Sequence, residues 1–172
     1  MPERELTIRQ LLWRAYVPQW AHDPLSGAGA ALFGGRWNAL GQPCFYAARE
    51  LSTAWAEYNQ GLVQHPATIV RLVLSNARLA DLTDESFCRV MTVKPAIHKT
   101  EWRAAFDAGR VPKTHQVAKR LLDQDYDGVI YPSFMSHGGS CVALWRWNTE
   151  NTPRLRAIDP QRRLPKGPAS WL

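Results

Sequence analysis

A cation, an aromatic ring and a carboxylate stand close together in one short part of the chain. Arg36 follows Gly34 and Gly35, Tyr46 comes ten residues later, and Glu57 comes eleven residues after that. A planar guanidinium binds a diphosphate at two points, and preceding glycines let a ligand approach the backbone closely. A carboxylate stabilises the cationic ribose that forms when a nucleotide loses its base, and an aromatic wall holds that base. The pattern therefore predicts a site that holds a dinucleotide by its pyrophosphate and cleaves a ribose–base bond.

Three successive local elements must position these side chains. The sequence predicts a long glycine-rich loop over residues 18–35, after which Arg36 opens a strand region. Tyr46 is expected on a short buried strand over residues 43–48. Glu57 is expected on the helix that follows, about 100° around the helix from Tyr58. The apolar face of that helix is predicted to consist of Leu51, Ala54, Trp55, Tyr58 and Leu62.

Each candidate residue also has an ordinary structural explanation. Tyr46 alone is typical of a core tyrosine, and Glu57 alone of a carboxylate on a helix surface. Arg14 and Arg36 each have apolar neighbours, where an unpaired guanidinium is costly, so each needs either an internal carboxylate or an anionic ligand. The functional interpretation depends on their convergence in one strand–helix unit.

The remaining pattern predicts a single α+β domain over residues 1–172, with a bent or split mixed sheet flanked by helices. Its core is expected at about residues 11–147, and residues 148–172 form a basic C-terminal extension or a last strand. The sequence contains neither a G-x-G-x-x-G motif nor a Walker loop. Further strands are expected over residues 11–17, 68–75, 79–82, 129–131 and 141–147, with short helices within 84–110 and a longer one over 114–124.

Composition narrows the class of protein. Cys44, Cys88 and Cys141 are far apart and form no C-x-x-C pair, which indicates reduced thiols in a cytoplasmic protein and no metal site. We find no apolar signal segment and no run long enough to span a membrane, so no membrane partner is expected. The net charge of +6 suits an anionic small ligand, an acidic partner or nucleic acid.

Several motifs resemble those of RES-domain proteins, the toxins of the RES–Xre toxin–antitoxin family. The similarity runs from about residue 11 to residue 147 and is most specific in its first half. The matching segments are Leu12-Trp13-Arg14-Ala15, Asp23 to Gly29, Gly34-Gly35-Arg36-Trp37-Asn38, Tyr46-Ala47-Ala48, Ala54-Trp55-Ala56-Glu57, Asp127 to Ser133, and Gly138-Gly139.

This resemblance implies an ADP-ribosyltransferase-like fold and the consumption of NAD+ as a substrate, without a metal. The ADP-ribose acceptor is water, phosphate or a protein. An Xre-type DNA-binding antitoxin is the implied partner, and it is expected to cover the NAD+ cleft.

The resemblance also implies roles for individual residues. The catalytic arginine, tyrosine and glutamate of the family fall on Arg36, Tyr46 and Glu57. Arg14 joins Arg36 and Tyr46 in binding NAD+. The family's serine falls on Ser133, which is expected to help bind NAD+ by anchoring a ribose or a neighbouring side chain. The alternative is a residue before the later helix, namely Lys113, Thr114 or His115.

Two other function classes remain open at this point. A basic nucleic-acid-binding or RNA-cleaving module would use the net positive charge and the Trp–Arg pairs, which can stack on bases. Against it, the sequence shows no RNA-binding motif and no local histidine pair. A non-catalytic interaction domain would instead use its eight tryptophans as a partner surface.

Overall fold

The computed structural model describes residues 7–61 and 63–171. The seven strands are β1 (Thr7–Tyr16), β2 (Phe45–Ala48), β3 (Thr68–Ala77), β4 (Leu79–Asp81), β5 (Gly128–Pro132), β6 (Ser140–Leu144) and β7 (Arg154–Ala157). The α-helices are α1 (Ala28–Phe33), α2 (Leu51–Asn59), α3 (Glu85–Val90), α4 (Trp102–Asp107) and α5 (Lys113–Asp123). Three short 3-10 helices complete the described elements: η1 (Pro18–Trp20), η2 (Pro95–Lys99) and η3 (Pro168–Trp171).

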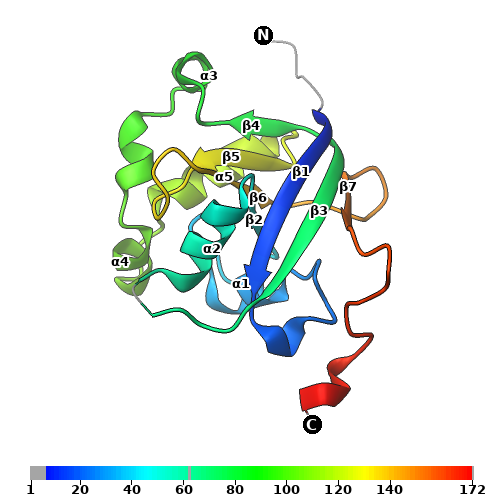
Figure 1. Ribbon diagram of the computed structural model, residues 1–172. Coiled ribbons are helices and arrows are strands. Elements are labelled where there is room, and N and C mark those ends of the chain that lie inside the picture. The colour runs from blue at the N-terminus through cyan, green and yellow to red at the C-terminus, as the bar shows by residue number, and fades with distance from the viewer. Residues whose placement is uncertain (1–6, 62, 172) are drawn as a thin grey trace.

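One mixed sheet organises the molecule, with the strand order β4-β5-β6-β2-β1-β3-β7 (Figure 1). Only the pair β4–β5 is parallel among the described strands. The long antiparallel pair β1–β3 runs in register from Thr7 with Ala77 to Tyr16 with Thr68. The structure therefore confirms the predicted α+β class.

The sheet is nearly split between β2 and β1. Within the described residues, these neighbouring strands pair at one position, Trp13 with Ala48, whereas β2 and β6 pair at four positions. Beyond Trp13 the two strands diverge. The widened space between them lies directly beside the residues that the sequence marks as candidates for chemistry.

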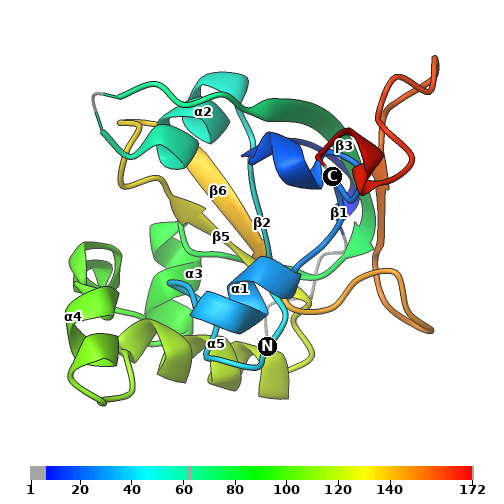
Figure 2. The same cartoon turned by 90° about the horizontal axis from the view of Figure 1, so that it is seen from below.

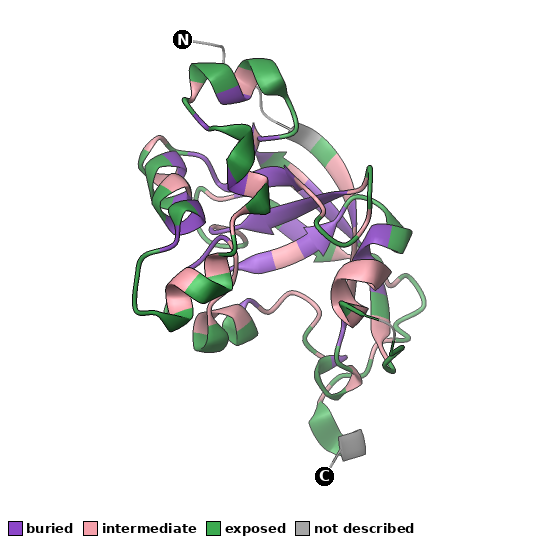
Figure 3. Cartoon of the chain, turned by 90° about the vertical axis from the view of Figure 1, so that its left-hand side faces the viewer, coloured by how far each residue is buried: buried purple, intermediate pink, exposed green. Residues whose placement is uncertain are grey.

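Two apolar clusters lie on opposite faces of this sheet, because side chains alternate along each strand. On one face, Val129 and Cys141 pack with Ala54 of α2 and Leu121 of α5. On the other face, Leu72 and its neighbours from β1 and β3 meet side chains from β5 and β6, which places this second cluster inside the bend of the sheet. Figure 3 shows the buried strands in the centre, surrounded by half-buried and exposed helices.

The helices of the first face surround the candidate site. Helix α2 packs mainly on β1 and β2, and α5 packs on β5. Figure 2 shows α2 on one side of strands β2, β5 and β6, with α4 and α5 gathered at the opposite end of this part of the sheet. Helix α5 confirms the predicted helix over residues 114–124, and its residues Ala118 and Leu121 face inward as predicted.

Three local predictions were wrong. The expected loop over residues 18–35 contains η1 and α1. Arg36 lies in a tight turn closed by a bridge between Gly35 and Asn38, and not at the start of a strand. On α2, Ala54 of the predicted apolar face is buried, but Leu51 is 43% exposed and Thr53, which was not predicted, is buried instead. Leu62, which was assigned to the same apolar face, lies outside the described residues.

Candidate active site

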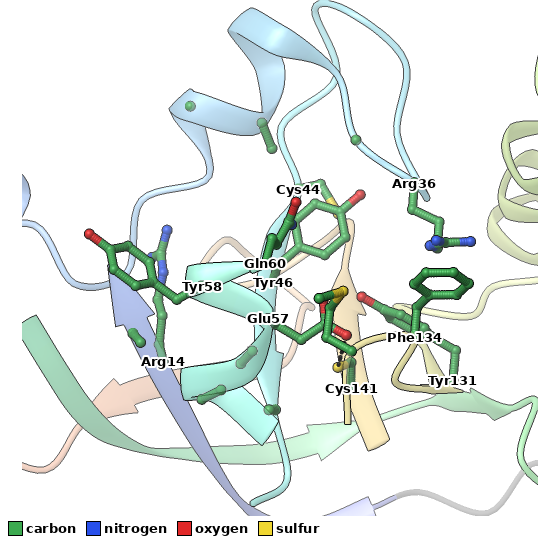
Figure 4. Close-up of a pocket in the computed structure, with 18 of the residues that line it drawn as sticks. Arg14, Arg36, Cys44, Tyr46, Glu57, Tyr58, Gln60, Tyr131, Phe134 and Cys141 are labelled. Atoms are coloured by element: carbon green, nitrogen blue, oxygen red, sulfur yellow. Dashed lines mark hydrogen bonds between the residues drawn. The ribbon is translucent and has the colours of Figure 1, made fainter. Parts of the chain in front are cut away.

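A cavity of about 520 Å³ opens where β1 and β2 separate, and Arg14, Arg36, Tyr46 and Glu57 all contribute to its lining. This volume is within the range of pockets that bind small organic ligands. Its walls come from β1, β2, α2, β5 and β6, and from the segments that carry Arg36 and Phe134 (Figure 4). The structure thus brings together side chains that are distant in the sequence.

Glu57 projects from the last turn of α2 into the middle of this cavity (Figure 4). Its Oε1 atom accepts a hydrogen bond of 2.6 Å from the hydroxyl of Ser133. The Cys141 thiol also points to Oε1, with a sulfur–oxygen distance of 3.8 Å. Among the described residues, Oε2 receives no hydrogen bond, so this oxygen is free to accept one from a ligand.

Ser133 is itself held in a defined orientation. Its Oγ accepts hydrogen bonds from the backbone N–H groups of Met135 at 3.2 Å and Ser136 at 2.9 Å. These two donors occupy the acceptor side of the hydroxyl, so its proton points at Glu57. Ser133 does not line the cavity directly. Its hydrogen bond to Oε1 of Glu57 orients that carboxylate.

Tyr46 on β2 presents its ring to the cavity while its hydroxyl is bound to the Arg36 turn. The hydroxyl accepts from the backbone N–H of Trp37 at 2.9 Å and donates to Oδ1 of Asn38 at 2.8 Å. Burial raises the pKa of Tyr46 well above its usual value, so the phenol remains a neutral donor. Its position suits a wall residue that also fixes the turn.

Asn38 completes this arrangement from a fully buried position. Its side-chain amide donates to the carbonyl oxygens of Ala30, Ala39 and Gln42, at 2.8 to 3.1 Å. One amide therefore holds the end of α1 and the chain after the turn together. These contacts explain why the Gly-Gly-Arg-Trp-Asn motif ends in an asparagine at position 38.

Gly35 and His115 fix the turn on its other side. A Cβ atom at Gly35 would lie 2.5 Å from the Tyr46 hydroxyl and 2.6 Å from Oδ1 of Asn38, so a side chain there is incompatible with both groups. The Gly35 carbonyl is 2.7 Å from Nε2 of His115, a residue of α5 that packs beside the rings of Trp102 and Phe106. The turn that carries Arg36 is therefore anchored by both β2 and α5.

Arg36 offers an uncompensated positive charge to the cavity. Its Nη1 donates to the Thr100 carbonyl over 3.4 Å, and its guanidinium lies 5.8 Å from the centre of the Phe134 ring. In the part of the chain that the structure describes, no carboxylate lies within ion-pair distance of it. Such a guanidinium can bind an anionic group at two points.

Arg14 lies at a different end of the cavity (Figure 4). It alternates with Trp13 on β1, so its side chain points to the opposite face of the sheet from Tyr46. There its guanidinium lies 4.6 Å from the centre of the Phe45 ring, and Nη1 donates to the Pro24 carbonyl at 2.8 Å. Burial lowers the pKa of Arg14 to about 10, which leaves it charged at neutral pH.

The structure thus brings Arg36, Tyr46, Glu57 and Ser133 into one group and leaves Arg14 at its margin. The alternatives to Ser133 lie elsewhere: Lys113 is exposed, Thr114 is buried, and neither these two nor His115 line the cavity. Geometry favours Ser133 as the residue next to the carboxylate.

Sequence reasoning overlooked several residues that line the cavity. Tyr131 on β5 is 8% exposed and presents its hydroxyl to the cavity (Figure 4). Phe33 and Phe134 lie at the rim and are 77% and 69% exposed. The alternation of β5 places Tyr131 on the same face as Val129, and this pattern was the available signal for its orientation.

The described residues offer neither a metal site nor a membrane-spanning helix. We find no group of three or more His, Cys, Asp or Glu side chains that could hold a metal ion. No described helix has the length and apolar character needed to cross a membrane. Cys44, Cys88 and Cys141 are free and buried.

Comparisons with known proteins give a family match and a similar solved structure. The sequence model of a family described as the RES domain matches residues 11–167. A chain in the crystal structure of the M. tuberculosis MbcT–MbcA toxin–antitoxin complex has a similar fold, with a TM-score of 0.62 and 18% identity. That match covers 86% of this chain and 81% of the other. A search of curated proteins finds no match.

Proposed function

Because this chain belongs to the RES-domain family, we propose that it is the toxin of a toxin–antitoxin pair and that it consumes NAD+. The reaction is cleavage of the bond between nicotinamide and ribose. One observation carries this proposal: the free Oε2 of Glu57 and the unpaired guanidinium of Arg36 belong to the same cavity. We place the protein in the cytoplasm, where NAD+ is available to it.

The proposed step begins with departure of nicotinamide. The bond between C1′ of the ribose and the pyridinium nitrogen breaks, its electron pair moves to that nitrogen, and neutral nicotinamide leaves. The ribose becomes an oxocarbenium-like cation, which Glu57 stabilises electrostatically. A nucleophile then adds to C1′ and loses its proton.

The other candidate residues each have a defined role in this reaction. Ser133 holds Oε1, so that Oε2 is presented to the ribose. Arg36 binds the pyrophosphate, and the Tyr46 ring packs against nicotinamide or its ribose. Arg14 adds a second positive charge at the far end of the cavity and binds the more distant anionic part of the dinucleotide.

The acceptor of ADP-ribose is water, phosphate or a protein side chain. Incubation with NAD+ in the presence and absence of phosphate, followed by mass analysis of the sugar product, separates these three outcomes. ADP-ribose identifies a glycohydrolase, ADP-ribose-1″-phosphate identifies a phosphorylase, and a labelled protein identifies a transferase.

We propose an Xre-type DNA-binding antitoxin as the partner. The similar fold in the MbcT–MbcA toxin–antitoxin complex supports an antitoxin partner in general. The rim of the cavity also carries exposed apolar side chains, including Phe33, Phe134 and Met135, which suit burial against a protein. An antitoxin seated on this rim would close the NAD+ cleft.

Growth and NAD+ content of producing cells test the proposal together. Cells that produce the wild-type chain should lose NAD+ and stop growing, whereas cells that produce Arg36→Ala at the same level should keep both. Co-production of the antitoxin should restore growth. A growth arrest in which NAD+ stays constant would contradict the proposal.

Nucleic-acid binding is the second candidate, and one observation favours it. Arg9, Arg71, Arg154 and Arg156 are exposed on the neighbouring strands β1, β3 and β7. Binding to a polyanion that weakens steeply with salt, together with no effect on NAD+, would support this function instead. The enclosed position of Arg14 and Arg36 suits a small ligand better than a duplex or an extended strand.

A further inference from the structure

Three tyrosines line the cavity, and their hydroxyl groups differ in one respect. The Tyr46 hydroxyl donates to Asn38, and the Tyr58 hydroxyl donates to the Pro66 carbonyl at 2.7 Å. In the described part of the chain, the Tyr131 hydroxyl has no hydrogen-bond partner. Tyr131 is nevertheless only 8% exposed, so its hydroxyl meets the cavity and little else.

The orientation of Tyr131 is fixed by its surroundings. It lies on β5, and its ring packs on the buried Trp37 with a centroid distance of 5.4 Å. Figure 4 shows the hydroxyl pointing toward the middle of the cavity, on the side of Glu57 and Cys141. The hydroxyl therefore reaches the cavity without a partner among the described residues, and a polar group in this position usually binds water or a ligand.

The protonation state of Tyr131 makes it a donor. Burial raises the pKa of Tyr131 well above its usual value, and the neighbouring charge of Glu57 adds to this effect while Arg36 opposes it. The phenol is therefore neutral at physiological pH. The free Oε2 of Glu57 can only accept, so the two groups offer complementary contacts to one sugar.

The geometry points to Tyr131 as a further substrate-binding residue, whose hydroxyl donates a hydrogen bond to a hydroxyl oxygen of the nicotinamide-side ribose. This inference rests on the proposed NAD+-consuming function. The ribose is then held between a donor from β5 and an acceptor from α2, with C1′ facing the carboxylate. Specificity for an intact ribose follows, because removal of the contacted hydroxyl leaves the phenol without its acceptor.

Substrate analogues test this contact directly. The rate of nicotinamide release is measured for wild type and Tyr131→Phe with NAD+ and with its 2′-deoxy and 3′-deoxy forms, altered in the nicotinamide ribose. We expect Tyr131→Phe to lower kcat/KM for NAD+ by about 3- to 10-fold, as for loss of one neutral hydrogen bond. For one of the two deoxy forms, wild type and Tyr131→Phe should have equal kcat/KM.

Tyr126→Phe serves as the matched control, because Tyr126 is also buried but does not line the cavity. Its ratio of kcat/KM for NAD+ to kcat/KM for each deoxy form should equal that of wild type. An unchanged kcat/KM for NAD+ in Tyr131→Phe, or equal losses of that variant on all three substrates, would overturn the inference and leave the proposed function intact. Absence of nicotinamide release by wild type would overturn the proposed function and the inference together.

Discussion

The hydroxyl of Ser133 and the carboxylate of Glu57 are separated by 76 positions in the sequence and by 2.6 Å in space. A hydrogen bond to a charged group is worth more than one between neutral groups, and this one occupies Oε1 and leaves Oε2 free of partners among the described residues. At the residue scale, the site is therefore a carboxylate whose orientation is set by a neighbour. The resemblance left Ser133 and residues 113–115 as alternatives, because a contact between side chains 76 positions apart has no local signal in the sequence.

Ser133→Ala should lower kcat for nicotinamide release by roughly 10- to 100-fold, as expected for loss of a hydrogen bond to a charged group. The KM for NAD+ should change less, because Arg36 and Tyr46 are untouched. Steady-state kinetics provide the measurement, and Ser86→Ala, which removes an exposed serine hydroxyl on α3, is the control. Equal kcat values for Ser133→Ala and wild type would show that Ser133 does not orient the carboxylate.

Buried thiols near the site give a pH prediction at the same scale. Burial raises the pKa of the Cys44 thiol from 9.0 to about 12. Above pH 9 the unfolded chain loses this proton while the folded chain keeps it, so the free energy of unfolding falls as pH rises toward 12. Cys141, Tyr46 and Tyr131 have raised pKa values and act in the same direction.

Urea unfolding at pH 8 and at pH 10.5 measures this effect. The free energy of unfolding of wild type should fall between pH 8 and pH 10.5. It should fall less for Cys44→Ala, because one of the groups with a raised pKa is absent. Arg14 opposes the trend above pH 10, since its pKa is lowered in the folded chain. An identical loss in wild type and Cys44→Ala would contradict the assigned cause.

At the scale of elements, the sequence predicted those with strong periodicity. Helix α5 repeats its apolar residues at helical spacing, and β2 is a short apolar run, so both were found. Helix α1 was missed, because six residues with a glycine and no side-chain cap carry little local signal. The turn at Arg36 was taken for a strand, because its shape depends on Tyr46, Asn38 and His115.

The residues of the candidate site also differ in whether a local sequence pattern could predict them. Arg36, Tyr46 and Glu57 are close in sequence, and the strand–helix unit brings them to one cavity. Tyr131 and Ser133 approach that cavity through the pairing of β5 with β6 and of β6 with β2. Such long-range pairing is a property of the sheet, so no local pattern identified these two residues as neighbours of Glu57.

The contact between α5 and the Arg36 turn leads to a prediction at this scale. His115→Leu places a side chain of similar size beside Trp102 and Phe106 but removes the ring nitrogen that contacts the Gly35 carbonyl. Loss of this partner for the half-buried Gly35 carbonyl should lower the free energy of unfolding by about 0.5–1.5 kcal/mol. The KM for NAD+ should rise, because the turn that presents Arg36 is loosened.

Thermal unfolding and steady-state kinetics measure the two effects of His115→Leu. His65→Leu is the control, since His65 is exposed and distant in the chain from the turn. A destabilised His115→Leu protein with an unchanged KM would show that α5 supports the fold without positioning Arg36.

At the scale of the whole molecule, the candidate site depends on the near-split of the sheet. The single registered position between β1 and β2 leaves room for a cavity that a continuously paired sheet would fill. The apolar cluster inside the bend of the sheet stays packed despite this opening. The reason is that β1 is paired with β3 along its length and β2 is paired with β6. The molecule thus combines one seven-stranded sheet with an opening lined by Arg14, Arg36 and Glu57.

The central claim is that Glu57 stabilises the ribosyl cation inside this opening, and a comparison of wild type with Glu57→Gln tests it most directly. The measurement is nicotinamide release from NAD+, with NAD+ affinity determined on the same samples by calorimetry. Because glutamine keeps the shape and removes the charge, we predict that release falls by about 100-fold or more while affinity changes little. Release by Glu57→Gln at the wild-type rate would contradict the claim.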